Sequence, residues 1–253
     1  MRKQNPLIIA LAALVIAVAG WLGFDLGALQ GGDQPPARTA QAPSTPSPAP
    51  TRRDEPARPV PEGDFDYYVL ALSWSPSYCE QEATERDRLQ CGGRPFHFIV
   101  HGLWPQNERG YPEDCPTDAP RVPDALIDEM LDIMPSRGLV GHQWRTHGAC
   151  TGLSQEDYFQ AVRAAWQAVA IPPRFEQLET AVTLPPRDIA SAFVAANPML
   201  QPDHLSVTCS KNALDEVRLC MTKDLRFTAC GAQTRRSQCR QDRIRMPPVR
   251  YSR

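Results

Sequence analysis

The sequence has little net charge and lacks several motifs that mark common classes of protein. Its 27 basic and 29 acidic residues leave a formal charge of −2. This balance excludes a histone-like protein that coats nucleic acid through a large basic excess. There is no glycine-rich phosphate loop and no paired metal-binding carboxylate motif, so we expect no cofactor. No Asn-X-Ser/Thr sequon occurs, so N-glycosylation is not expected. The charge balance does not exclude a compact active site for nucleic acid.

Composition and length indicate a folded, exported protein. Hydrophobic residues make up 42% and charged residues 22% of the 253 positions, which excludes wholesale disorder. That length suits one ordinary domain or two small ones. The eight cysteines are an even number, which is typical of disulfide-bonded proteins in oxidising compartments.

The N-terminal part of the sequence predicts export followed by a spacer. Arg2 and Lys3 precede an apolar run at 7–24, so residues 1–29 are expected to form a signal peptide or a membrane anchor. Residues 30–62 contain nine prolines and read as a Pro-rich linker. A linker favours the anchor, since a spacer is most useful when one end is held. We expect a catalytic domain at 63–253, in the periplasm or outside the cell.

Within that domain, hydrophobic spacing predicts an α+β fold with an antiparallel sheet packed with helices. Strands and helices do not alternate regularly, which disfavours a doubly wound fold. A second strand is expected to stop before Gly102 and Pro105. The predicted strands are 67–74, 96–101, 205–209, 216–221 and 226–228, and the predicted helices are 124–134, 154–169 and 188–196.

Three of the five histidines lie in two unusual segments. Residues 99–105 read IVHGLWP at a strand end, and residues 142–150 read HQWRTHGAC. If the second segment is helical, Gln143 and His147 share one face, while His142 and Thr146 share the neighbouring one. His101 could then reach the same groove from the strand. Two imidazoles suit acid–base catalysis near neutral pH.

These residues admit three interpretations. They could be packed or surface histidines without a role. They could form a zinc site with Cys150, although the two helical histidines are five apart rather than the four that zinc sites favour. They could also perform two-histidine acid–base catalysis without a metal. That chemistry needs a substrate that carries its own nucleophile, as RNA does in its 2′-hydroxyl.

The two segments, in this order, resemble the active-site segments of the ribonuclease T2 family. The similarity extends from about Asp64 to Pro247 and includes a Ser73-Trp74-x-Pro76 segment. The resemblance implies a metal-independent endoribonuclease that cleaves single-stranded RNA through a 2′,3′-cyclic phosphate, with little base specificity. It further implies a disulfide-stapled fold and no cofactor. We expect the chain to act as a monomer.

The resemblance also implies roles for individual residues. His147 matches the general base, His101 the acid that protonates the leaving 5′-oxygen, and His142 the histidine that holds the phosphate. Trp104 matches an aromatic residue of the base pocket, and stacking on an indole would tolerate any base. Tyr111 lies where a further pocket aromatic could sit. The implied disulfides are Cys79–Cys91, Cys115–Cys150, Cys209–Cys239 and Cys220–Cys230.

Two positions depart from the family pattern. Gln143 replaces a glutamate, and Thr146 replaces a lysine, and both charged groups are thought to stabilise the pentacoordinate phosphate. Gln143 can still donate a hydrogen bond. Arg145 could supply the missing charge, but it lies about 100° around a helix from Thr146. We therefore expect an active enzyme, and the alternative is a catalytically weak or inactive RNA-binding module of the same fold.

Overall fold

The computed structural model describes residues 63–84 and 87–249. The predicted signal peptide or anchor and the Pro-rich linker lie outside these residues. Among the described residues, no helix is long and apolar enough to cross a membrane.

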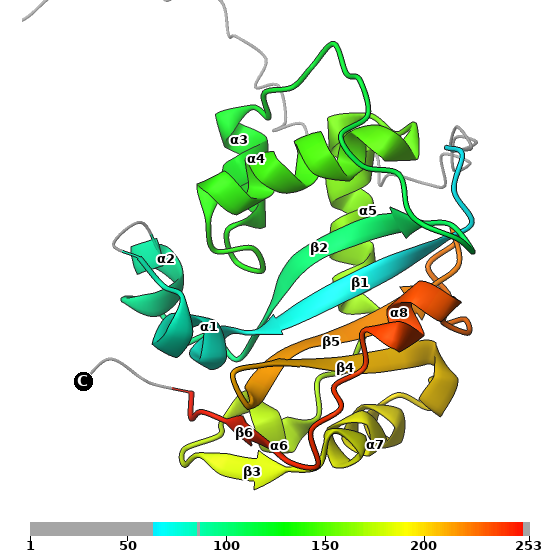
Figure 1. Cartoon of the computed structure of the whole chain (residues 1–253). Coiled ribbons are helices and arrows are strands. Elements are labelled where there is room, and N and C mark those ends of the chain that lie inside the picture. The colour runs from blue at the N-terminus through cyan, green and yellow to red at the C-terminus, as the bar shows by residue number, and fades with distance from the viewer. Residues whose placement is uncertain (1–62, 85–86, 250–253) are drawn as a thin grey trace, which may run out of the picture. The chain divides into compact units, whose positions relative to one another are not determined.

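A six-stranded sheet forms the centre of the fold (Figure 1). The sequence predicted such a sheet, but not its strands at 182–184 and 244–246. The strand order is β2-β1-β5-β6-β3, and β4 pairs with β5 beside this path. Neighbours are antiparallel except β5 and β6, which pair in parallel at Ala213 and Arg245. The strands are β1 Tyr67–Trp74, β2 Phe98–Gln106, β3 Val182–Leu184, β4 Leu205–Ser210, β5 Ala213–Met221 and β6 Ile244–Met246.

Helices and short 3₁₀ turns fill the connections. They are α1 Ser75–Gln81, α2 Arg88–Cys91, α3 Asp124–Met130, α4 Arg137–Thr146, η2 Gly148–Thr151, α5 Gln155–Gln167, α6 Pro173–Glu176, α7 Pro186–Ala196, η3 Pro202–His204 and α8 Ala232–Arg236. The predicted helices 154–169 and 188–196 are confirmed as α5 and α7. Ser154 caps α5, since its hydroxyl accepts a hydrogen bond from the Asp157 amide.

Two predicted elements are shorter than the sequence suggested. The helix expected at 124–134 ends at Met130, and the following turn places the Ile133 carbonyl against the Val100 amide at 2.8 Å. This hydrogen bond satisfies a β2 amide that faces away from the sheet partner. The strand expected at 226–228 is a single antiparallel bridge between Phe227 and Met221.

Strand β2 is longer than predicted and contains a β-bulge. Pro105 does not end it, because β2 is an edge strand in which a missing amide is tolerated. Gly102 does not end it either, because it pairs with Ala71 of β1. Its register with β1 shifts between Ala71, opposite Gly102, and Leu72, opposite Val100, so His101 has no partner of its own. An extra residue of this kind reverses the side-chain alternation that follows it.

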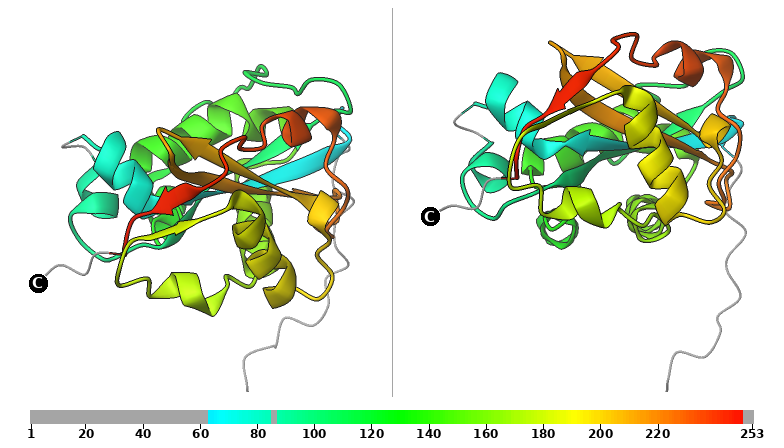
Figure 2. Two further views of the ribbon diagram at one scale, coloured as in Figure 1. Left: turned by 60° about the horizontal axis from the view of Figure 1, so that its bottom comes forward. Right: turned by 90° about the horizontal axis from the view of Figure 1, so that it is seen from below.

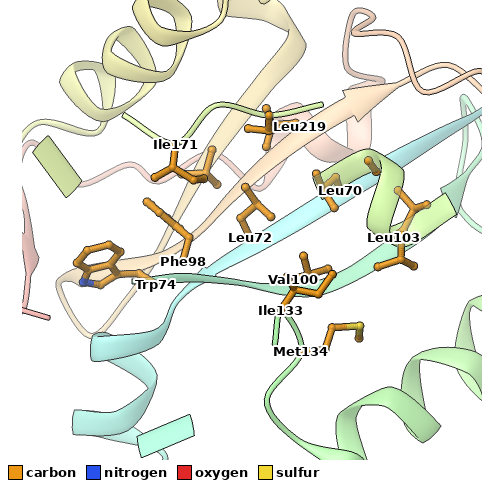
Figure 3. Close-up of a cluster of buried hydrophobic side chains, with 14 of the residues drawn as sticks. Leu70, Leu72, Trp74, Phe98, Val100, Leu103, Ile133, Met134, Ile171 and Leu219 are labelled. Carbon is orange, nitrogen blue, oxygen red and sulfur yellow. The ribbon is translucent and has the colours of Figure 1, made fainter. Parts of the chain in front are cut away.

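One face of the sheet carries the hydrophobic core. Leu70 and Leu72 of β1 pack there with Val100 and Leu103 of β2 and with Leu219 of β5 (Figure 3). Helices α5, α6 and α7 cover this face, and α8 lies on the other (Figure 2). On the opposite face a small cluster contains Tyr67, Val69, Cys220 and Cys230, with Trp104 packed against it. The functional side chains discussed below lie on this second face.

The structure forms the four disulfides implied by the resemblance: Cys79–Cys91, Cys115–Cys150, Cys209–Cys239 and Cys220–Cys230. Cys115–Cys150 fastens the loop before α3 to η2. The sulfur of Cys150 is therefore not a thiolate, which removes the ligand that the zinc interpretation required.

Candidate active site

Helix α4 positions two of the three histidines. Ser136 caps its start by accepting a hydrogen bond from the Leu139 amide, and the helix ends at Thr146. The helix considered for residues 142–150 therefore covers only 142–146, and η2 follows from Gly148. Thr146 Oγ1 lies 3.4 Å from Nδ1 of the exposed His142, one turn away, so these two side chains share a face. His147 follows as the C-cap, and its amide donates to the Gln143 carbonyl.

The bulge in β2 brings the third histidine to the same place. Val100 and Leu103 both point into the core, although they are three residues apart. Strict alternation would put His101 and Trp104 on opposite faces, whereas the extra residue places both on the face away from the core. Bulges are common beside active sites for this reason, because they re-aim a side chain.

Trp104 lies between the two predicted catalytic histidines. Its ring centroid is 5.3 Å from that of His101 and 5.4 Å from that of His147. Its indole Nε1 donates a 2.8 Å hydrogen bond to Oε1 of Gln143, whose side chain is only 1% exposed. The tryptophan thus connects β2 to α4 and fixes the spacing of the two imidazoles.

Gly102 makes the hydrogen bond between Trp104 and Gln143 sterically feasible. A Cβ at this position would lie 2.0 Å from Gln143 Oε1 and 2.3 Å from Trp104 Nε1. We therefore expect Gly102→Ala to displace the indole and to lower the free energy of unfolding by about 1–3 kcal/mol through overpacking. Urea unfolding followed by tryptophan fluorescence measures both effects. An unchanged midpoint and spectrum would contradict this steric argument.

A buried carboxylate contacts His101 from β5. Glu216 Oε1 lies 2.5 Å from His101 Nδ1, and Glu216 is 3% exposed. Burial raises the pKa of Glu216, but the hydrogen bond and charge of His101 and the guanidinium of Arg218 outweigh it and lower this pKa to about 2. The carboxylate is therefore ionised and can only accept, so Nδ1 of His101 donates. This leaves Nε2 as the nitrogen available for chemistry.

His147 has a different environment. Its Nδ1 is buried and has no hydrogen-bond partner among the described residues. Burial, followed by the positive charges of His142 and His101, lowers the pKa of His147 to about 4, and the Asp114 carboxylate opposes this shift only weakly. The imidazole is therefore neutral, and able to accept a proton, through most of the acid range.

We expect an NMR titration of the imidazole protons to give His147 an apparent pKa near 4. The unfolded chain takes up this proton near pH 6.5, before the folded chain does. The free energy of unfolding therefore falls as the pH is lowered from 6.5 towards 4. His147→Gln should remove this part of the pH dependence of unfolding. A titration midpoint for His147 at 6 or above would contradict the assigned environment.

The histidines on α4 open onto a cleft of about 870 Å³. Its lining includes Trp104, Tyr111, His142, Arg145, Thr146, His147 and Arg218. A second hollow of about 390 Å³ is lined by His101 and Glu216, and His101 does not line the larger cleft. Arg218 lines both.

Comparison with known proteins decides the family. Residues 65–230 match the model of the Ribonuclease T2 family. The chain belongs to the ribonuclease T2 family.

Several family members are similar to it in sequence. A ribonuclease of Aeromonas hydrophila is 48% identical over 98 residues, covering 39% of this chain and 43% of that protein. A probable ribonuclease of Haemophilus influenzae is 38% identical over 120 residues, covering 42% and 44%. The chain thus spans less than half the length of these two relatives. Ribonuclease I of Escherichia coli is 28% identical over 206 residues, covering 64% and 77%.

Solved structures confirm the fold. An RNase-related protein from Calystegia sepium superposes with a TM-score of 0.59 at 18% identity, covering 74% of this chain and 98% of that one. RNase NT, solved in complex with 5′-AMP, superposes with a TM-score of 0.57 at 22% identity, covering 73% and 99%. The predicted α+β, ribonuclease T2-like architecture is therefore confirmed.

In this ribonuclease T2 family member the predicted site residues lie in one region, but some line the cleft and others are buried. His142, His147, Arg145 and Tyr111 line the cleft, whereas Gln143 is buried beneath it. Oε1 of Gln143 accepts from Trp104, and the expectation that Gln143 donates a hydrogen bond through its amide nitrogen stays a prediction.

Sequence reasoning missed Glu216 and Arg218. They stand two apart in β5, so both point to the face of His101 and Trp104. A signal was present, because two charged residues alternate there with Val217 and Leu219 inside a predicted strand. The sequence did not show that these two residues lie near His101, because this depends on the pairing of β5 with β1.

Proposed function

We propose that this chain is an extracytoplasmic endoribonuclease that cleaves single-stranded RNA by transphosphorylation, leaving a 2′,3′-cyclic phosphate, with little base specificity. The observation that carries the proposal is the contrast between two imidazoles on either side of Trp104. His147 is buried and neutral, whereas His101 faces an ionised carboxylate. A neutral imidazole can accept a proton as the base, and an imidazole that donates through Nδ1 to a carboxylate can present Nε2 to the leaving group as the acid.

The chemistry follows from these assignments. Neutral His147 accepts the proton of the 2′-hydroxyl, and the 2′-oxygen attacks the adjacent phosphorus. The bond from phosphorus to the 5′-oxygen breaks, and His101 delivers a proton from Nε2 to that oxygen. His142, exposed in the cleft, holds the phosphate. No cofactor enters these steps, because RNA supplies the nucleophile.

Low base specificity is supported by the aromatic groups of the cleft. Tyr111 is 42% exposed there and offers a surface on which any base can stack. Trp104 is covered in part by His101, His147 and Arg218, so its free surface is smaller. Stacking does not distinguish the four bases as base-edge hydrogen bonds do.

The proposed location rests on the disulfides and on the N-terminal sequence. The chain has four disulfides. Disulfides persist in oxidising compartments and are rare in the cytosol. The apolar run at 7–24, expected to be cleaved or retained as a membrane anchor, would direct export. Cell fractionation with an antibody to the domain separates a membrane-bound from a released form.

The alternative is a catalytically weak RNA-binding module. It is favoured by α4, in which Gln143 and Thr146 bring no charge towards the phosphate. The test uses the full chain with its disulfides formed, 5′-labelled single-stranded RNA and excess EDTA. We expect products ending in 2′,3′-cyclic phosphate, and no cleavage of an RNA whose single 2′-deoxy residue occupies the cleavage position. Tight binding without cleavage would favour the module, and loss of cleavage in EDTA would contradict the metal-free mechanism.

A further inference from the structure

Helix α4 places little positive charge beside His147. Gln143 is neutral and committed to Trp104, and Thr146 is neutral. Arg145 lines the cleft, but its guanidinium lies along its own helix, with Nη1 3.1 Å from where a Cβ on Gly141 would stand. Preorganised charge is usually a large part of the catalysis of phosphoryl chemistry. A positive charge beside the phosphate must therefore come from another element of the fold.

Strand β5 supplies a guanidinium at the required place. The Arg218 guanidinium lies 5.2 Å from the centre of the Trp104 ring, and Trp104 contacts both His101 and His147. Arg218 lines both hollows, the one that His147 lines and the one that His101 lines. Its Nε donates a 2.7 Å hydrogen bond to Glu216 Oε2. No described residue accepts from Nη1 or Nη2, which leaves the outer donors free for a phosphate.

The sheet explains how a β5 side chain reaches a site built on β2. Strand β1 separates β2 from β5. Ala71 of β1 pairs with Gly102 on one side and with Arg218 on the other. Leu70 and Leu72 point into the core, so Ala71 points to the site face. Because Ala71 is small and Gly102 has no side chain, the side chains of Arg218 on β5 and Trp104 on β2 can approach each other across β1.

Glu216 links this arginine to His101. One carboxylate oxygen accepts from His101 Nδ1, and the other accepts from Arg218 Nε. Ser73 of β1 adds a 3.4 Å hydrogen bond from its hydroxyl to the first oxygen. The carboxylate is almost fully buried, so losing it would leave a histidine and an arginine without their partner.

We propose that Arg218 is a catalytic residue that stabilises the negative charge of the pentacoordinate phosphate, and that Glu216 is a positioning residue that orients both Arg218 and His101. This inference rests on the proposed function and assigns to β5 the charges that the family pattern places on the helix. As the 2′-oxygen bonds to phosphorus, charge grows on the two non-bridging oxygens. The planar guanidinium can donate to one or both through its Nη groups. The 5′-oxygen then leaves with the proton from His101, and Arg218 exchanges no proton.

The decisive variants are Arg218→Gln and its matched control Arg226→Gln, compared in kcat and KM for cleavage of single-stranded RNA. Each removes one positive charge, but Arg226 is exposed, pairs with Asp224 and lines neither hollow. We expect Arg218→Gln to lower kcat by about 10²–10³-fold, with KM changed only a few-fold. Arg226→Gln should leave kcat within a few-fold of wild type. A lysine restored at position 146 should recover part of the lost kcat in the Arg218→Gln, Thr146→Lys double variant.

Each outcome decides between the inferences. If the wild-type chain cleaves and both arginine variants lose activity equally, or if Arg218→Gln changes only KM, Arg218 merely attracts RNA and the proposal is overturned. If wild type does not cleave, the proposed function fails, and with it the role of Arg218. Arg218→Lys covers the case in which the glutamine variant misfolds. It retains the charge and should keep more kcat than glutamine, yet less than arginine.

Glu216→Gln tests the positioning role. The amide fills the same volume but carries no charge, so it cannot accept from both His101 Nδ1 and Arg218 Nε as the carboxylate does. We expect kcat to fall while KM changes only a few-fold. Glu216→Asp retains the charge and should recover part of the lost kcat. Equal losses of kcat in the two variants, or a change in KM alone, would indicate a purely structural carboxylate.

Discussion

Replacing His147 with alanine is expected to lower kcat for RNA cleavage by about 10²–10⁴-fold, because general base catalysis contributes this much. The lowered pKa of His147, about 4, keeps the wild-type imidazole unprotonated at neutral pH, so the variant loses a base that is already in its active form. Initial rates on labelled single-stranded RNA at several concentrations separate kcat from KM. KM should change little, since His142 and Arg218 remain in the cleft.

His101→Ala should lose activity to a similar degree through loss of the acid. The double variant should lose far less than the product of the two single effects, because the two groups act in one proton-transfer sequence. His97→Gln is the matched control. His97 stands just before β2, and its Nδ1 accepts a hydrogen bond from the Phe98 amide, away from the residues that line the cleft. A His147→Ala variant that cleaves as fast as the His97 variant would refute the assignment of the base.

The parts of the fold that were predictable from sequence depend on neighbours along the chain. Strand β1 has the predicted bounds because an unbroken run of branched and aromatic residues is a local property. Helix α5 begins where predicted because its cap is formed by residues three apart. The two histidine segments were recognisable for the same reason. In each segment, 99–105 and 142–150, the characteristic residues lie within a few positions of one another.

The parts that were not predictable depend on residues far apart in the sequence. Strand β2 continues past Gly102 because it pairs with β1, and the bulge at His101 exists only in that pairing. Glu216 and Arg218 became candidate site residues only when β5 was placed beside β1, more than a hundred residues from His101. The turn after α3 likewise follows from a hydrogen bond between Ile133 and the distant Val100.

Removing the Cys115–Cys150 disulfide should lower the free energy of unfolding by about 4 kcal/mol, because it closes a loop of 35 residues in the unfolded chain. The Cys115→Ser, Cys150→Ser double variant tests this by urea unfolding. The bridge also shapes the cleft, since it fastens the loop that carries Tyr111 to η2, which follows α4. A second attachment nearby is weaker, the 2.9 Å hydrogen bond from the Asp114 amide to the Thr146 carbonyl. We therefore expect KM for RNA to rise as well, as Tyr111 loses its fixed position.

The Cys79–Cys91 disulfide is the matched control for this effect on the cleft. It joins α1 to α2 over a separation of 12 residues, and neither cysteine lines the cleft of the histidines. The double serine variant there should lose about 3 kcal/mol, only slightly less than the first, with KM unchanged. Equal effects of both pairs on KM would show that the cleft responds to general loosening of the fold. A rise in KM confined to the Cys115–Cys150 variant would show that this bridge holds the wall on which the substrate base stacks.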